Sequence, residues 1–158
     1  TVYLVSFDNN LEYIIGIVAI AVIPGFCEEY FFRGILQKNL NLIFKNHHAA
    51  IIVSSLLFSA FHLQFYGFFP RLFLGVFFGY LFYWSGSLIY PVIAHAFNNF
   101  LSLTVFYAAS SGFFGENFDL SVNSSPDIPL VVIVLSIIIF IFLLSILKEK
   151  LKEINESG

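Results

Sequence analysis

The residues of this sequence best suited to chemistry are carboxylates, imidazoles and an amide set within apolar stretches. They occur in CEEYFFRG, FSAFH and HAFNN, and they are Glu28, Glu29, Arg33, His62, His95 and Asn99. A carboxylate in a dry site is a suitable general base, because burial favours its protonated form. Glu28 could take a proton from a water that His62 positions. His95 and Asn99 could donate hydrogen bonds to a developing oxyanion.

Three of these residues are also ligand types that bind a divalent metal with an open coordination position. Carboxylate and imidazole are zinc ligands, so Glu28, His62 and His95 could hold Zn²⁺. The sequence lacks the HExxH spacing of the zincins. The zinc route and the metal-free route both predict hydrolysis of a carbonyl compound, for which we favour an amide. The residues alone leave the two routes open.

The two neighbouring acids differ in what lies near them along a helix. Glu29 and Arg33 are four residues apart with the acid first, which is the favourable order for a helical ion pair. Glu29 is therefore either a structural partner of Arg33 or part of the site. Glu28 lies about 100° around the helix from Glu29 and has no equally placed local partner. We therefore favour Glu28 as the functional acid.

The composition indicates that these residues are carried by membrane-spanning helices. Of 158 residues, 59% are hydrophobic and only 11% are charged, whereas a soluble domain has roughly a quarter charged residues. No Asp, Glu, Lys or Arg occurs between Lys45 and Arg71, or from Leu72 to Gly115. A soluble helical bundle with a very apolar core is the less favoured alternative. We predict an all-α, polytopic transmembrane bundle that forms one domain over residues 1–158.

The charge gaps and the Gly/Pro punctuation predict five helices. Their expected ranges are Asn10–Leu40, His48–Tyr66, Pro70–Ser85, Leu88–Ser110 and Ile128–Lys152. Pro24-Gly25 should bend or break the first helix, which is too long for one simple crossing. Cys27 is expected to be a small buried hydrophobe, and His47 and His48 are expected at the surface.

The lysines predict the orientation of these helices. Lys38 and Lys45 follow the first helix, and Lys148, Lys150 and Lys152 follow the last. Five spans place both groups on one side, whereas the opposite side receives Arg71 and an acidic loop with Glu116, Asp119 and Asp127. The positive-inside rule then puts the C-terminus in the cytoplasm. We expect an integral protein of a bacterial plasma membrane, with membrane lipid as a partner.

The candidate residues are expected to meet inside the bundle. Residue counts from the helix ends bring Glu28, His62 and His95 to overlapping depths on three different helices. Ionisable side chains at such depth usually face the bundle interior and serve a function. The net charge of −3 and the lack of a basic patch argue against a nucleic-acid partner.

The order of the three motifs resembles that of a known family. Glu-Glu-x-x-x-Arg, Phe-x-x-x-His and His-x-x-x-Asn, over residues 28–99, resemble the CPBP family. That family includes type II CAAX prenyl proteases and bacteriocin-processing or self-immunity proteins. Members typically have around eight spans, so the five predicted here correspond to the core of the domain.

The resemblance implies a glutamate-dependent intramembrane endopeptidase, commonly labelled a metalloprotease. Glu28 would activate water, Glu29 and Arg33 would support the site, and His62 would join Glu28 at the water or metal. His95 and Asn99 would form the oxyanion hole, or His95 would bind the metal. Phe58 would pack against His62 and orient it. The substrate would be a membrane-associated peptide, either prenylated or of the leader type.

Two other functions compete with proteolysis. A peptide-binding or bacteriocin-immunity membrane protein could keep this fold without catalysis. A transporter or proton relay also uses buried Glu and His, but the sequence has no inverted repeat and no paired broken helices. The complete set of motifs favours catalysis.

Overall fold

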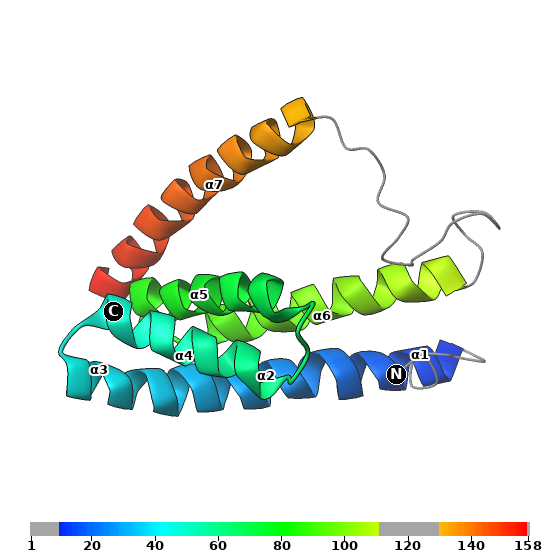
Figure 1. Ribbon diagram of the computed structural model, residues 1–158, viewed down its shortest axis with the longest axis horizontal. Coiled ribbons are helices and arrows are strands. Elements are labelled where there is room, and N and C mark those ends of the chain that lie inside the picture. The colour runs from blue at the N-terminus through cyan, green and yellow to red at the C-terminus, as the bar shows by residue number, and fades with distance from the viewer. Residues whose placement is uncertain (1–9, 111–129, 158) are drawn as a thin grey trace.

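The computed structural model describes the backbone of residues 10–110 and 130–157, and side chains over residues 11–108 and 141–156. Within these ranges every regular element is a helix, and five helical rods follow one another along the chain (Figure 1). The predicted all-α fold is therefore confirmed. The acidic loop with Glu116, Asp119 and Asp127 lies outside the described residues.

The first rod is one continuous helix from Asn10 to Phe44. It consists of α1 (Asn10–Gly16), the π-helical η2 (Ile17–Val22), α2 (Ile23–Glu29), the π-helical η3 (Tyr30–Gln37) and α3 (Lys38–Phe44). The predicted break at Pro24-Gly25 is wrong, because the helix runs through both residues. The wide π-helical turn of η2 ends just before Pro24, and π-helical turns are sites where an α-helix accommodates irregular backbone hydrogen bonding.

The second and third rods form an antiparallel hairpin. The first rod ends at Lys45, which adopts a left-handed conformation with φ of 51°. Asn46 then caps α4 (His47–Phe61) by accepting hydrogen bonds from the amides of His48 and Ala49. After a turn, α5 (Phe68–Ser85) runs back along α4, and Gly86 forms its C-cap. The predicted extension of the second helix to Tyr66 is wrong, because α4 ends at Phe61.

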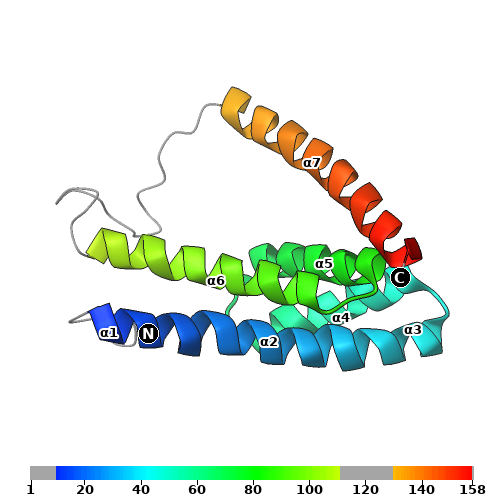
Figure 2. The same cartoon turned by 180° about the vertical axis from the view of Figure 1, so that it is seen from behind.

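The last two rods are α6 (Ile89–Ser110) and α7 (Leu130–Ser157). Figures 1 and 2 show α6 lying along the first rod, while α7 slants away from the bundle and meets it near its own C-terminal end. The hydroxyls of Tyr13 on α1 and Thr104 on α6 share a hydrogen bond of 2.7 Å. Leu151 of α7 packs with Phe78 and Leu81 of α5. The two predicted lysine groups therefore lie at the same end of the bundle.

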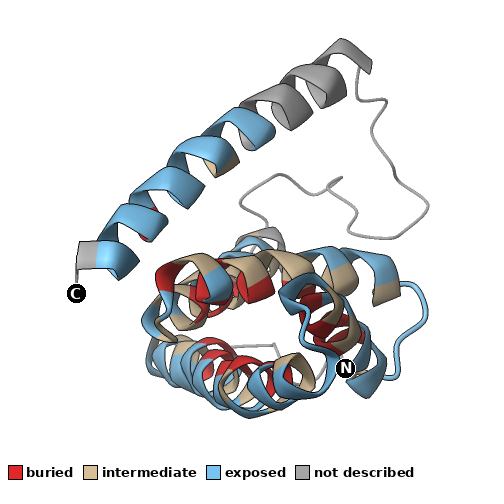
Figure 3. Cartoon of the chain, turned by 90° about the vertical axis from the view of Figure 1, so that its left-hand side faces the viewer, coloured by how far each residue is buried: buried red, intermediate tan, exposed pale blue. Residues whose placement is uncertain are grey.

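Apolar side chains cover the outside of the bundle. Figure 3 shows the buried residues on the faces that the helices turn toward one another, with exposed residues around them. Leu42, Phe73 and Phe97 are 73%, 71% and 61% exposed. A soluble protein rarely exposes so much apolar surface, and lipid would cover it. By length and composition, two helices among the described residues, Leu11–Phe44 and Ile89–Ala108, could cross a membrane, while α4 is apolar but shorter.

Candidate active site

A buried ion pair lies at the centre of the candidate site. Arg33 Nη1 donates to Glu29 Oε1 at 2.9 Å, and neither side chain is exposed. The predicted pairing of these two residues is confirmed. Arg33 also donates through Nη2 to the carbonyl of Gly75 at 2.9 Å. The guanidinium lies 4.8 Å from the ring centroid of Phe58, so apolar and aromatic groups surround this charge.

The same oxygen of Glu29 also contacts His95. His95 Nδ1 lies 2.8 Å from Glu29 Oε1, and the imidazole is 5% exposed. Because Glu29 is a carboxylate paired with Arg33, it accepts, and Nδ1 of His95 must donate. The ring of His95 stacks on Phe78 at a centroid distance of 5.1 Å. Glu29 therefore fixes both the orientation of His95 and the nitrogen that carries its proton.

Glu28 faces two histidines rather than Arg33. Its Oε2 atom lies 3.8 Å from Nε2 of His62 and 3.9 Å from Nε2 of His95. These distances are too long for direct hydrogen bonds. Oε2 is buried and has no hydrogen-bond partner among the described residues. The structure thus brings Glu28, His62 and His95 together from α2, the end of α4, and α6.

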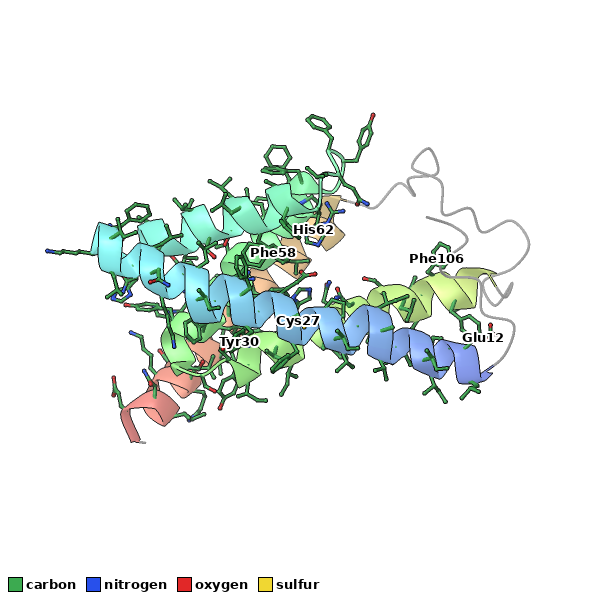
Figure 4. The ribbon with its side chains drawn as sticks, turned by 90° about the horizontal axis from the view of Figure 1, so that it is seen from below. Glu12, Cys27, Tyr30, Phe58, His62 and Phe106 are labelled. Atoms are coloured by element: carbon green, nitrogen blue, oxygen red, sulfur yellow. The ribbon has the colours of Figure 1, made fainter. Side chains whose placement is uncertain are left out.

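His62 is held by the backbone of its own helix. It occupies the C-cap of α4, and its Nδ1 lies 3.0 Å from the carbonyl oxygen of Phe58. A carbonyl oxygen only accepts, so Nδ1 of His62 carries the proton. The ring of Phe58 packs edge-on against His62 at 5.2 Å and against His95 at 5.7 Å. This packing agrees with the predicted role of Phe58, and Figure 4 shows Phe58 and His62 together on α4.

These bonds leave two acceptor nitrogens, one on each histidine, facing the carboxylate of Glu28. With both Nδ1 atoms protonated, the neutral imidazoles present lone pairs at Nε2 toward the carboxylate of Glu28. Each lone pair repels the carboxylate in a low dielectric unless a hydrogen or a cation lies between them. Glu28, Glu29 and Arg33 together carry one net negative charge. The arrangement therefore suits a water, an added proton on an imidazole, or a cation.

The donor chemistry of this trio is that of a zinc site, but the arrangement is not a closed ligand set. Carboxylate and imidazole are zinc ligands, and Glu29 behind His95 resembles the carboxylates that orient metal-bound histidines. In the part of the chain that the structure describes, no three His, Cys, Asp or Glu side chains are grouped as metal ligands. Zinc at Glu28, His62 and His95 stays a prediction.

An open pocket of about 410 Å³ leads to Glu28 and His62. Its wall includes Ile20 and Pro24 of the first rod and Asn99 and Ser102 of α6. Nδ2 of Asn99 donates weakly to the carbonyl of Ile20 at 3.5 Å, a contact that a stronger acceptor could replace. Asn99 therefore lies in the same pocket as Glu28, as its spacing from His95 suggests.

The sequence did not predict that α5 contributes to the site, and the prediction that Cys27 is buried is wrong. Cys27 is exposed rather than buried, because the inward positions of α2 are Gly25 and Glu29 and Cys27 projects from the opposite side. The carbonyls of Gly75 and Gly79 hold Arg33 and Gln37, the latter at 3.2 Å. Backbone acceptors give no residue-type signal, although the four-residue spacing of the two glycines is visible in the sequence.

A comparison with known families gives one match. The family model described as "Type II CAAX prenyl endopeptidase Rce1-like" matches residues 10–101, more than half of the chain. The matched range contains all six candidate residues. No curated protein and no solved structure matches the chain.

Proposed function

Because the chain belongs to the Rce1-like family of type II CAAX prenyl endopeptidases, it is a membrane protein of a protease family, and we propose that Glu28 is its general base. In this proposal a water held by Glu28 attacks a peptide bond of a membrane-associated substrate. The supporting observation is the buried, unpartnered Oε2 of Glu28, which faces the Nε2 atoms of His62 and His95.

The first step needs a water held between Glu28 and His62. Oε2 of Glu28 and Nε2 of His62 are 3.8 Å apart, so both can lie within about 2.9 Å of one water oxygen. The water donates one hydrogen to Glu28 and the other to His62. Glu28 removes its proton as the oxygen bonds to the carbonyl carbon, and the carbonyl π electrons move to the carbonyl oxygen.

The developing oxyanion needs hydrogen-bond donors, which we assign to Asn99 and His95. Asn99 can release the carbonyl of Ile20 and offer Nδ2 to the oxyanion. His95 can donate from Nε2 only when both of its nitrogens carry protons. In that form Nδ1 still donates to Glu29 at 2.8 Å, and the added proton makes the cluster of Glu28, Glu29, Arg33 and His95 neutral.

The second step breaks the C–N bond. Protonated Glu28 returns its proton to the leaving nitrogen, the oxyanion re-forms the carbonyl, and an amine and a carboxylic acid are released. Glu28 is thereby restored to the carboxylate. Glu29 and Arg33 act as positioning residues in this cycle, because they orient His95 and do not reach the open pocket.

The substrate is proposed at the level of its chemistry. The pocket continues from Glu28 between η2 and α6, so a peptide could lie along these two helices. Both prenylated C-terminal peptides and leader-type peptides presented by the membrane fit this description. A panel containing both classes, incubated with the purified protein in lipid nanodiscs, would identify which class is cleaved.

Zinc is tested separately from the base. If the metal-free route operates, incubation with a strong chelator followed by its removal leaves the cleavage rate unchanged, and metal analysis finds less than stoichiometric zinc. If cleavage is lost with the chelator and returns on adding Zn²⁺, Glu28, His62 and His95 are the residues that would hold the ion.

The experiment that tests the function compares cleavage with peptide binding. The wild-type protein should cleave a peptide of the panel, whereas Glu28→Gln should bind the same peptide and leave it intact. Glu156→Gln, which changes an exposed acid at the far end of α7, serves as the matched control and should cleave normally. If the wild type binds peptides tightly and cleaves none of them, the non-catalytic binding or immunity function replaces the proposal.

A further inference from the structure

A second pocket lies at the opposite end of the bundle from the open side of the candidate site. It encloses about 260 Å³ between the end of the first rod, the start of α4 and the end of α5. Its polar lining includes Gln37, Lys38, Asn41, His47 and Tyr83. None of the six candidate site residues contributes to it. It therefore needs an explanation of its own.

The residues around this pocket are those that occupy the surface layer of a membrane. Tyr80, Tyr83 and Trp84 lie on the last turns of α5, and Lys45 ends the first rod nearby. Tyr80 Oη shares a 2.8 Å hydrogen bond with Nδ1 of His48. Tyrosine and tryptophan are enriched at the membrane–water interface, and lysines reach toward it. These residue types at this end of the bundle support a position of the pocket near the lipid headgroups.

The charge of the pocket favours an anion. Lys38 is exposed at its wall, with Nζ 5.4 Å from the ring centroid of Phe82, and no ion pair joins it to a carboxylate among the described residues. His47, whose ring packs on Tyr83 at 4.7 Å, can add a second positive charge when protonated. Among the residues that the structure describes, no Asp or Glu lines the pocket.

The pocket also contains an acceptor that lacks a donor. Oδ1 of Asn41 is buried and has no hydrogen-bond partner among the described residues. Leaving a buried acceptor unsatisfied costs free energy that a ligand can recover. Asn41 itself lines the pocket, so its side chain is within reach of a ligand there. The ligand should therefore combine an anionic group with a hydrogen-bond donor.

We propose that this pocket binds the headgroup of a phospholipid whose phosphate is followed by a hydrogen-bond donor. The phosphate would contact Lys38 and His47, and the donor would reach Asn41. The ammonium of an ethanolamine headgroup and the hydroxyls of a glycerol headgroup both supply such a donor, whereas the quaternary ammonium of choline has no N–H. The apolar outside of the bundle beside the pocket would carry the acyl chains.

The test measures lipid retention by the purified full chain with native mass spectrometry. Phosphatidylglycerol and phosphatidylethanolamine should be retained about tenfold more strongly than phosphatidylcholine, a factor typical of giving one buried acceptor its missing hydrogen bond. Lys38→Gln should weaken retention of all three lipids by a similar factor. Asn41→Leu should remove the preference over phosphatidylcholine while leaving phosphatidylcholine retention unchanged.

Two matched variants separate the pocket from the general charge of the surface. Lys45→Gln and Asn39→Leu change exposed residues of the same types at the same end, outside the pocket lining. Both should retain lipids as the wild type does. If Lys45→Gln weakens retention as much as Lys38→Gln, or the wild type shows no preference among the lipids, the headgroup site is overturned.

The source of the phosphate is tested with water-soluble compounds. Glycerol phosphate and phosphoethanolamine, which carry the same headgroup chemistry without acyl chains, should compete only at much higher concentration than the lipids. Competition at equal concentration would identify a soluble phosphate compound as the ligand and would overturn the lipid. Peptide cleavage is not needed for any of these measurements, so their outcome is independent of the proposed catalytic role of Glu28.

Discussion

The protons on two imidazoles decide which chemistry is open to Glu28. Nδ1 of His62 donates to a carbonyl, and Nδ1 of His95 donates to Glu29, so both Nε2 atoms face Glu28 without a fixed proton. A site of this kind accepts hydrogens from a water or a proton on one ring. If either Nδ1 contact were absent, that imidazole ring could rotate, and its Nε2 atom would no longer be held toward Glu28.

Asn99 and its neighbour Asn98 test the oxyanion assignment. Asn99→Ala should lower kcat by about 10²–10³ with little change in KM, because an oxyanion donor acts mainly in the transition state. Asn98→Ala is the control, since Asn98 lies outside the pocket lining. Steady-state kinetics on the preferred peptide would check both. A tenfold rise in KM with unchanged kcat for Asn99→Ala would instead indicate ground-state binding.

At the scale of residues, local spacing could be read from the sequence and distant partners could not. The pairing of Glu29 with Arg33 follows from helical geometry, and the structure has it at 2.9 Å. The contact between Glu29 and His95 joins residues 66 positions apart, so it depends on how α2 and α6 pack. Cys27 was misjudged because the inward face of α2 is narrow and set by Gly25 and Glu29.

At the scale of elements, two glycines of α5 let three helices approach closely. A Cβ at Gly79 would lie 2.8 Å from Cγ2 of Ile51 on α4 and 3.0 Å from Oε1 of Gln37. The carbonyls of Gly75 and Gly79 meanwhile accept hydrogen bonds from Arg33 and Gln37. Small residues four apart serve such close packing between membrane helices.

Gly79→Ala should therefore lower the thermal stability of the purified protein, because the added methyl group overlaps Ile51. The double variant Gly79→Ala/Ile51→Ala should recover part of this loss relative to Ile51→Ala alone. Gly34→Ala is the control, since its Cβ would lie 3.2 Å from the flexible end of Leu88 and at ordinary contact distance, 3.9 Å, from the ring of Tyr30. Equal thermal shifts for Gly79→Ala and Gly34→Ala would contradict this account of the packing.

The number and order of the helices could be predicted from the sequence, but their internal irregularity could not. Charge gaps and Gly/Pro positions indicated five helices, because long apolar runs have few other solutions in lipid. The π-helical segments η2 and η3 carry no comparable composition signal. The sequence also predicts too late an end for the helix that stops at Phe61, because residues 62–66 contain no Asp, Glu, Lys, Arg, Gly or Pro to mark it.

At the scale of the whole molecule, unequal helix lengths open the site on one side. At 1.5 Å per residue, α4 is about 22 Å long and α6 about 33 Å. Both helices begin at the lysine-bearing end of the bundle. Because α4 is shorter, it and His62 at its end stop before the opposite end of α6 is reached. The pocket that holds Glu28 opens in the space that α4 leaves between the first rod and α6.

The membrane orientation is a prediction that cysteine labelling can test. In a Cys27→Ser background, Tyr66→Cys places a thiol in the turn between α4 and α5, and Glu156→Cys places one near the C-terminus. If the lysine-bearing end faces the cytoplasm, a membrane-impermeant maleimide added to intact cells should label only Tyr66→Cys. Labelling of Glu156→Cys alone would show the opposite orientation.

The most direct test of the catalytic account is the single-turnover rate of Glu28→Gln. The glutamine keeps the size of the side chain but cannot accept a proton from water, so the rate should fall by at least about 10²-fold while the peptide still binds. The circular dichroism spectrum and thermal midpoint should match those of the wild type. If Glu28→Gln cleaves the peptide at the wild-type rate, Glu28 is not the base and the proposed mechanism is wrong.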